Sequence, residues 1–491
     1  ADTKGGFGIE NIGGEGNAML GIINPVVDDL QNIIKINDSN IMNNLYYGVL
    51  NQTVNTIDAK NNWWGRKDGP NPSETFGLVD VEPWSETDTR NAKQIIVCCS
   101  NILFIPGFEA SRLYKEEESF LGTSTNTLWE PNRNDDVRKL YMDNNGKSLD
   151  NTIFTKDIMD VALGIKSVYK KFINSMDNLV DDKTINQWLP LAYDWRNGIY
   201  DVVDDKAVNT AIDLAKKSKT GKLTIIAHSN GGLFTKQLMK KLENIGEDAL
   251  VDKIINVAVP ELGTPEAMLS MLHGHNQSIG MGSIMTENNA RSFSTNLPGA
   301  YGLLPTKRFF EKNPLTVISS MFDKNTLIST FNDMKNFLLN NSFSVASSTN
   351  TQIPLLLNPY LLSKNETFHS NIDTWKPASS TKVLSIFGWG NPTSEVLNYS
   401  RDPHCDNKTN NCDPIYSAKL TESGDGTVIT DSNSGNANSI SYFNLDMLNK
   451  ENLSSINHAN ILESRQLQSK IIDTVKGNIS TSTKLDYEKY F

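Results

Sequence analysis

The chain has 491 residues and a formal net charge of −11 at pH 7, which is long enough for two or three domains that each bury a core. Lysine and arginine residues form no patch that could face phosphates, so the composition argues against a nucleic-acid-binding protein. No apolar run reaches the ~18 residues of a transmembrane helix. The best candidate, IIVCCSNILFIPGF, is interrupted by Ser100, Asn101 and Pro106 and is typical of a buried strand.

Residues 1–85 are rich in Asn, Gly and Ile, and short apolar pieces such as IIKIN and LYYGVLN recur between Asn-containing turns. This pattern favours a coiled parallel β-structure. The run NNWWGRKDGPNP, residues 61–72, resembles the closing motif of right-handed parallel β-helix domains. Because such coils need at least ~3 units for stability, we expect a truncated β-helix remnant whose precursor continues upstream. The alternative is a local turn in which Trp63 and Trp64 pack. A linker follows at 86–93.

Residues 94–480 alternate strand-like and helix-like segments, which predicts a mostly parallel sheet covered on both faces. The segment 202–215 is an amphipathic helix with its apolar residues at helical spacing. The long insertion 265–378 breaks the alternation and is expected to form a helical cap, and the insertion 109–185 is more polar. The predicted sheet strands lie within residues 94–108, 187–195, 222–229, 252–260 and 381–389.

The stretch AHSNG places Ser229 between a strand-like and a helix-like segment. A serine in a G-x-S-x-G elbow is exposed at such a turn, where a base can activate it as a nucleophile. Here Ala227 replaces the first glycine. The alternative interpretation is that Ser229 caps the following helix. We expect His228 to be structural, because its side chain would point away from Ser229 at an elbow.

In this fold class the acid and the base follow the serine in that order. Asp425 in ESGDGTVI lies among small residues, and His458 in INHANIL precedes a helix-like segment. The carboxylate would fix the imidazole tautomer and stabilise the imidazolium. Other candidates stay open, namely Asp402, Asp413 and Asp431 for the acid, and His404 and His369 for the base.

An acyl-transfer site also needs backbone N–H donors for the oxyanion. One is expected from Asn230, directly after the serine. The other is expected from Phe108, because the first sheet strand ends in FIPG and Gly107 allows the chain to turn there. The alternative is that Pro106-Gly107 is a plain turn.

The four cysteines form two groups. Cys405 and Cys412 bracket a polar loop and could close a disulfide ring in an exported protein. Of the adjacent Cys98 and Cys99, one is expected to face the core as a small hydrophobe. A zinc site is the rival interpretation, but paired C-x-x-C spacing is missing, and we expect neither a metal nor a cofactor.

Several motifs occur in the order found in the lecithin:cholesterol acyltransferase-like family of α/β-hydrolases, and the chain resembles that family over residues 94–475. They are PGFEASRL, YDWR (193–196), AHSNGG, GTP (263–265), LPGAYGLLP, GDGTV and HANIL. The resemblance implies a triad of Ser229, Asp425 and His458, and oxyanion amides from Phe108 and Asn230. It also implies an ester-bearing lipid substrate and a lid near 109–130. The loop CDNKTNNC has no family counterpart that we can identify.

We therefore expect an α/β-hydrolase domain preceded by a β-helix remnant. The function is expected to be a serine hydrolase or acyltransferase that acts on lipid carboxylic esters through an acyl-enzyme, with the substrate possibly presented at a membrane or micelle interface. The apolar residues of 265–378 suit an acyl-chain groove or ordinary core. Architecture and scarce cysteines favour a secreted or cell-surface protein. The alternatives are an adhesion or glycan-binding protein with an inactive hydrolase domain, and a serine peptidase or thioesterase on the same fold.

Overall fold

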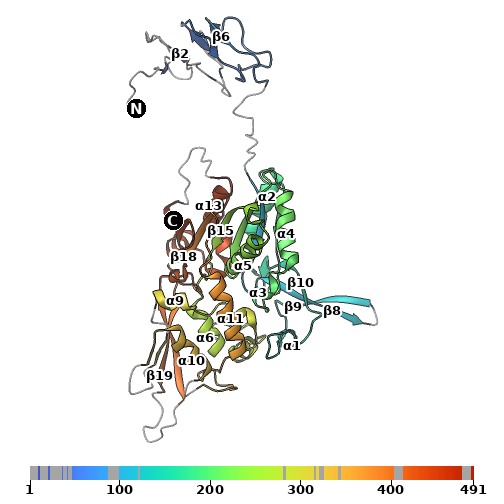
Figure 1. Cartoon of the computed structure of the whole chain (residues 1–491), viewed down its shortest axis with the longest axis vertical. Helices are drawn as coiled ribbons and strands as arrows, with labels where there is room; N and C mark the ends of the chain where they lie inside the picture. The colour runs from blue at the N-terminus through green and yellow to red at the C-terminus, as the bar shows by residue number, and fades with distance from the viewer. Residues whose placement is uncertain are drawn as a thin grey trace. The chain divides into compact units, whose positions relative to one another are not determined.

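Figure 1 shows the computed structural model of the chain, which divides into two compact units, Ala1–Ile96 and Val97–Phe491. Each unit is described by itself. The structure describes residues 9–11, 20–22, 36, 41, 47–52, 54–86, 99–119, 122–279, 283–313, 317–319, 326–340, 344–402, 413–477 and 488–491. The loop of Cys405, Cys412 and His404 lies outside these residues, so the predicted disulfide ring stays a prediction.

The first unit contains short strands with mostly parallel pairings. The sheet order is β1-β2-β3-β5, with β4 beside β6. Among the described pairs only β1 and β2 are antiparallel. Trp64 is buried among Ile41, Val49, Ile57 and Ala59, whereas Trp63 is half-buried. The β-helix remnant stays a prediction. The strands are β1 (Ile9–Asn11), β2 (Leu20–Ile22), β3 (Val49–Asn51), β4 (Ile57–Asp58), β5 (Thr75–Phe76) and β6 (Val79–Asp80).

The second unit is built on a central sheet, for which the described residues supply six strands in the order β13-β7-β14-β15-β18-β21. Every neighbouring pair is parallel. Five strands lie where the sequence predicts them, and β21 was not predicted. The predicted α/β-hydrolase fold class is confirmed. The strands are β7 (Asn101–Ile105), β13 (Trp188–Pro190), β14 (Leu223–His228), β15 (Val251–Val257), β18 (Lys382–Trp389) and β21 (Ser439–Asn444).

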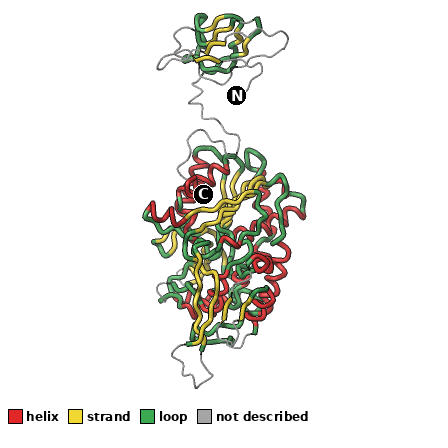
Figure 2. Tube along the Cα trace, turned by 90° about the vertical axis from the view of Figure 1, so that its left-hand side faces the viewer, coloured by secondary structure: helices red, strands yellow, loops and turns green. Residues whose placement is uncertain are grey.

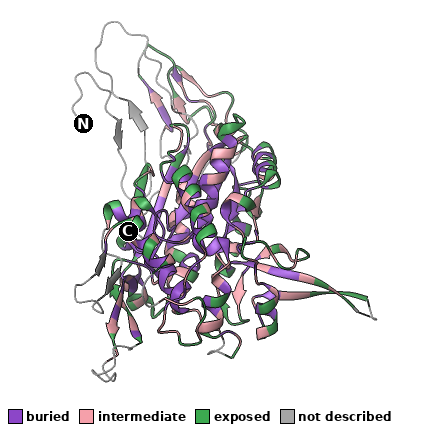
Figure 3. Ribbon diagram, turned by 60° about the horizontal axis from the view of Figure 1, so that its bottom comes forward, coloured by how far each residue is buried: buried purple, intermediate pink, exposed green. Residues whose placement is uncertain are grey.

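Helices lie on both sides of the central strands (Figure 2), and the strands and the helix faces against them are buried (Figure 3). The predicted amphipathic helix is α4, whose buried positions include Val208, Ala211, Ile212 and Ala215. Its N-cap is Asp204, whose carboxylate accepts the Ala207 N–H. The helices of this layer are α2 (Lys170–Asp181), α3 (Ile199–Val202), α4 (Asp205–Lys216), α5 (Gly231–Asn244), α12 (Leu445–Asn452) and α13 (Arg465–Val475), with the 3-10 turns η1 (Asp248–Leu250), η2 (Thr430–Ser432), η3 (His458–Glu463) and η4 (Glu488–Tyr490).

The predicted cap lies between β15 and β18 and is mostly helical, but it also contains two strands that the sequence analysis did not predict. These strands join a second sheet of order β17-β16-β19-β20. The cap elements are α6 (Pro265–His273), α7 (Glu287–Ser294), α8 (Pro298–Tyr301), α9 (Lys307–Lys312), α10 (Phe331–Leu339), α11 (Pro359–Ile372), β16 (Val317–Ser319) and β17 (Thr326–Ile328), and β19 (Thr393–Arg401) and β20 (Pro414–Thr421) complete the sheet.

The predicted lid segment forms an antiparallel hairpin of β8 (Ser111–Ser119) and β9 (Gly122–Trp129) that extends away from the body of the unit (Figure 1). Its base is buried at Leu113 and Trp129, and a third strand, β10 (Phe154–Ile158), pairs with β8. Its role as a lid stays a prediction. The other elements of this insertion are α1 (Asn134–Lys139), β11 (Val161–Ala162) and β12 (Lys166–Ser167).

A buried ion pair joins α5 to the chain after β15. Lys236 and Glu261 are 4% and 2% exposed, and their nearest charged atoms are 3.5 Å apart. Glu261 also accepts hydrogen bonds from the Ser385 hydroxyl and from the backbone and hydroxyl of Ser434. Burial alone would raise the pKa of Glu261, but Lys236 and these hydrogen bonds outweigh it and lower the pKa below its ordinary value of 4.5. The carboxylate is therefore charged and fully partnered in the core.

Candidate active site

Ser229 lies at the sharp turn between β14 and α5. Its φ is 53°, in the left-handed region that non-glycine residues seldom adopt, and its N–H donates to the Val257 carbonyl at 2.9 Å. The interpretation of Ser229 as the helix cap is wrong, because the N-cap of α5 is Asn230. Backbone strain of this kind costs about 1–3 kcal/mol and is typical of functional positions.

The turn depends on residues without side chains. A Cβ at Gly231 would lie 2.3 Å from the Ile105 carbonyl oxygen, and one at Gly107 would lie 3.0 Å from the Ser229 Cβ. The strand β7 and the start of α5 therefore approach each other more closely than side chains would allow, which brings the loop after β7 against Ser229.

Replacing Gly231 by alanine is expected to lower the free energy of unfolding by about 1–3 kcal/mol, since the new methyl group can only be accommodated by moving backbone. Urea titration followed by far-UV circular dichroism measures this. The control is Gly302→Ala, where the nearest atom to the new Cβ is 3.3 Å away and the φ of −60° is helical. Equal stability of the two variants would show that the close approach has no energetic role.

Three of the predicted residues form one hydrogen-bonded chain. His458 Nε2 lies 2.8 Å from Ser229 Oγ, and His458 Nδ1 lies 2.8 Å from Asp425 Oδ2. The other carboxylate oxygen of Asp425 accepts the N–H groups of Thr427 and Val428. The His458 N–H donates to the Asp425 carbonyl at 2.9 Å, so main-chain and side-chain contacts both hold the imidazole against the carboxylate.

The structure does not bring the other described candidates to Ser229. His369 pairs instead with Asp373, with 2.7 Å between Nδ1 and Oδ1. Asp402 and Asp413 flank the ends of β19 and β20, and Asp431 lies in η2.

Phe108 and Asn230, the residues expected to supply oxyanion donors, lie on either side of this turn. Within the described residues, neither backbone N–H has a hydrogen-bond acceptor. The Asn230 side-chain amide donates to the Tyr193 hydroxyl at 3.2 Å, and that hydroxyl donates to the Pro106 carbonyl at 3.3 Å. Tyr193 of the YDWR motif thus links the helix start to the loop that carries Phe108.

His228 has contacts that the sequence did not reveal. Its Nε2 lies 3.0 Å from the His458 carbonyl oxygen, and its Nδ1 lies 2.7 Å from the Tyr169 hydroxyl. That hydroxyl also accepts the Gly107 N–H at 3.1 Å. Burial, together with the nearby His458, lowers the pKa of His228 well below its ordinary value of 6.5. Since a carbonyl only accepts, the neutral ring donates from Nε2 and accepts from Tyr169 at Nδ1.

Replacing His228 by phenylalanine is expected to cost about 1–3 kcal/mol of stability, because the His458 carbonyl loses its donor and the Tyr169 hydroxyl its acceptor. The turnover number of any reaction at Ser229 should fall about 10–100-fold as the His458 loop loses its anchor. Urea titration and steady-state kinetics measure the two effects. A double-mutant cycle with Tyr169→Phe serves as the control, and strictly additive effects would contradict the network.

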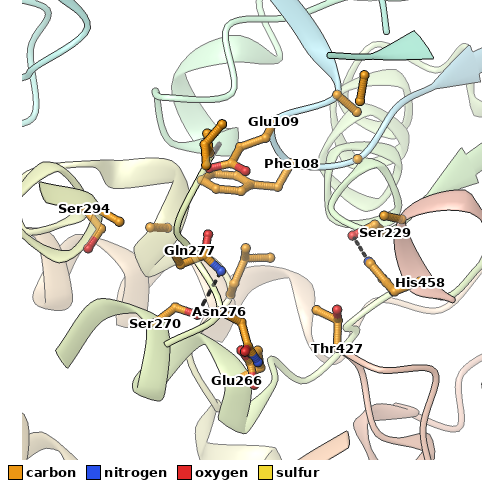
Figure 4. A pocket seen from close by; sticks show the side chains of 18 of the residues that line it. Phe108, Glu109, Ser229, Glu266, Ser270, Asn276, Gln277, Ser294, Thr427 and His458 are labelled. Carbon is orange, nitrogen blue, oxygen red and sulfur yellow. Dashed lines mark hydrogen bonds between the residues drawn. The ribbon is translucent and has the colours of Figure 1, made fainter. Parts of the chain in front are cut away.

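Ser229 and His458 line a cavity of about 500 Å³. Figure 4 shows them on one side, with Phe108 and Glu109 above and the side chains of the cap opposite. Much of the lining is apolar, and it comes from both the insertion 109–185 and the cap. The apolar side chains include Met159, Leu163, Val168, Met271, Ile279, Met285, Phe293, Leu297 and Leu303.

Two carboxyl groups in this cavity, Glu109 and Glu266, were not predicted from the sequence. Burial raises the pKa of each to about 7. In PGFEASRL and GTPEA the two residues follow motifs that the sequence analysis singled out, but nothing in the motifs indicates that their carboxyl groups reach one cavity.

Searches for other kinds of site gave no candidates in the described part of the chain. No group of three or more His, Cys, Asp or Glu side chains is arranged to hold a metal ion. Among the described helices, none combines the length and hydropathy needed to cross a membrane. Cys99 is buried, as expected for one of the adjacent pair, but it is disulfide-bonded and is not a free thiol.

Comparison with known proteins gives a family match and remote structural likenesses. The profile of the lecithin:cholesterol acyltransferase family matches residues 154–465, a range that includes Ser229, Asp425 and His458. No curated protein matches the sequence.

Three solved structures share part of the topology. The Tle4-Tli4 complex is 11% identical over 78% of this chain and 99% of that chain, with a TM-score of 0.48. Bacillus licheniformis lipase BlEst2 is 10% identical over 77% of this chain and 92% of that chain, with a TM-score of 0.32. Phospholipase PlaB from Legionella pneumophila is 9% identical over 77% of this chain and 63% of that chain, with a TM-score of 0.28.

Proposed function

Because the chain belongs to the lecithin:cholesterol acyltransferase family, we propose that it is a serine hydrolase or acyltransferase that cleaves carboxylic ester bonds of lipids. The observation that carries the proposal is the chain of hydrogen bonds from Asp425 through His458 to Ser229, with both contacts at 2.8 Å. This chain ends in a largely apolar cavity, where an acyl group can lie beside the serine.

In the proposed reaction, Ser229 Oγ attacks the ester carbonyl while His458 Nε2 takes its proton. Asp425 keeps the second imidazole proton on Nδ1 and stabilises the imidazolium. The N–H groups of Phe108 and Asn230 hold the tetrahedral oxyanion, each contributing about 10²–10³ in rate. The protonated His458 then gives its proton to the leaving alcohol, and an acyl-enzyme remains on Ser229.

The second half of the reaction decides between hydrolysis and transfer. Water or another alcohol attacks the acyl-enzyme, with His458 again acting as the base. A cavity that excludes water favours an alcohol acceptor. We also propose that the substrate is presented at a membrane or micelle interface and that the protein is secreted or cell-surface, in keeping with the disulfide at Cys99.

The test combines substrate profiling with active-site labelling. We expect hydrolysis of p-nitrophenyl esters with a preference for long acyl chains over acetyl, little activity on peptide amides, and covalent capture of Ser229 by a fluorophosphonate, located by peptide mass spectrometry. A protein that is inert to every ester would favour a binding function. A preference for peptide amides would favour a peptidase on the same fold.

A further inference from the structure

One side of the cavity carries a cluster of polar side chains, which we call the polar wall: Glu266, Ser270, Asn276 and Gln277. Glu266 and Ser270 are four residues apart on α6 and so lie on one face of the helix, and the other two follow in the next loop. The Asn276 amide donates to Glu266 Oε1 at 3.4 Å, and the Gln277 amide donates to Ser270 Oγ at 3.2 Å. Figure 4 shows this cluster facing the cavity across from Phe108.

Glu266 is a buried carboxyl group with an unused oxygen. The residue is only 6% exposed, and in the described part of the chain its Oε2 has no hydrogen-bond partner. Leaving such a group unpaired costs about 1–3 kcal/mol. Burial, the largest influence on it, raises the pKa of Glu266 to about 7. A carboxyl oxygen that lies beside a cavity and lacks a protein partner is available to a ligand.

Glu109 presents a second carboxyl group to the same cavity, next to the proposed oxyanion donor Phe108. Its φ is 62°, a strained value for a side chain of this size. Among the described residues no hydrogen bond or ion pair reaches its carboxyl group, although its backbone carbonyl accepts the Trp129 indole N–H at 2.8 Å. Neither packing nor pairing within the protein explains a carboxyl group at this position.

The charges that line the cavity restrict the ligand. Three acidic residues, Glu109, Glu130 and Glu266, face one lysine, the exposed Lys166. A lipid phosphate would meet carboxyl groups without a buried cation to balance its charge, which is unfavourable in a poorly solvated site. A protonated carboxyl group, a hydroxyl and two amides each offer a donor and an acceptor. Alcohol hydroxyl groups match that combination.

We propose that the polar wall, together with Glu109, binds the hydroxyl groups of an uncharged alcohol moiety, either glycerol or a sugar, and selects esters of that class over phosphate-bearing lipids. The inference rests on the proposed function, because it concerns the alcohol part of the ester that Ser229 attacks. It assigns the polar wall to the alcohol and the apolar lining to the acyl chain.

The first experiment needs only the wild-type protein. Monopalmitoylglycerol, glucose monopalmitate, palmitoyl lysophosphatidylcholine and p-nitrophenyl palmitate share one acyl chain and differ in the alcohol. We expect kcat/KM for the better of the two hydroxyl-rich esters to exceed that for the lysophospholipid at least about tenfold, the equivalent of one good hydrogen bond. Equal use of the lysophospholipid overturns the inference and leaves the proposed function standing. Inertness to all four esters overturns both.

The second experiment uses variants, scored as the ratio of kcat/KM for the preferred hydroxyl-rich ester to that for p-nitrophenyl palmitate. Glu266→Met should lower this ratio about tenfold, and Glu266→Gln, which keeps a donor and an acceptor, should restore most of it. Ser270→Ala tests the wall independently should Glu266→Met fold poorly. The matched control is Glu463→Gln, because Glu463 is also buried with an unpaired Oε2 but lies outside the cavity. Ratios that stay at the wild-type value in Glu266→Met and Ser270→Ala overturn the inference.

Discussion

The Ser229→Ala variant is expected to lose about 10⁴–10⁶ in kcat for every ester that the wild type hydrolyses. The loss follows from the mechanism, since without Oγ no acyl-enzyme forms and His458 has no proton to take. What remains is catalysis by the oxyanion donors and the binding site, which exceeds the reaction in water by about 10³–10⁴. Steady-state hydrolysis of p-nitrophenyl esters measures the loss, with fluorophosphonate labelling abolished in the same variant.

The matched control for this prediction is Ser432→Ala. Ser432 is fully buried, like the serine at the elbow, but its hydroxyl only donates to the Gly263 carbonyl at 2.7 Å. Its variant should keep kcat within the wild-type order of magnitude. An alanine at 229 that hydrolyses esters at the wild-type rate would assign the nucleophile to another residue.

The Lys236→Met variant is expected to lower the free energy of unfolding at pH 7 by about 3–5 kcal/mol, because it leaves the Glu261 carboxylate buried without its cation. Methionine keeps most of the lysine's apolar volume, so the effect isolates the charge. Guanidinium or urea titration gives the value. The double variant Lys236→Met/Glu261→Gln should recover much of the loss, since it removes the stranded charge and the isolated cation together.

The same pair predicts how the deficit depends on pH. In the wild type the pKa of Glu261 is below its ordinary value of 4.5, so its contribution to stability is present above that pH and is lost as the pH falls through the folded value. In Lys236→Met the lost cation raises the folded pKa, and the variant gains relative stability as its carboxyl group protonates. The deficit should therefore narrow from pH 7 towards pH 4. A deficit that is constant over this range would indicate lost packing alone.

The sequence predicts most of the central sheet because its inner strands are continuous apolar runs. All six residues of β14 are buried, which is the pattern of a parallel strand covered on both faces. The strand β21 was missed because it pairs only with β18 at the sheet edge, and most of its residues in the run SISYFN are exposed or half-buried. The strands of the cap were missed because their pairing joins 317–319 to 397–399, far apart in the chain.

The candidate site divides in a similar way. The elbow and the order of serine, acid and base are local patterns, so Ser229, Asp425 and His458 can be named from the sequence alone. The contact of His228 with the His458 carbonyl joins residues 230 positions apart, and the unpaired oxygen of Glu266 depends on what packs around α6. Neither can be read from neighbouring residues, because both are properties of the tertiary arrangement.

The bridging imidazole of His228 has a consequence for how activity is lost on heating. Through Tyr169 and the His458 carbonyl it joins the loop after β7 and the loop of His458 to the end of β14, a fully buried strand. Segments that open separately from a core do so because few buried contacts hold them. These two loops are held through a buried ring, so they belong to the cooperative unit of the sheet. Enzymatic inactivation and loss of sheet structure should then share one midpoint temperature, and His228→Phe should separate them.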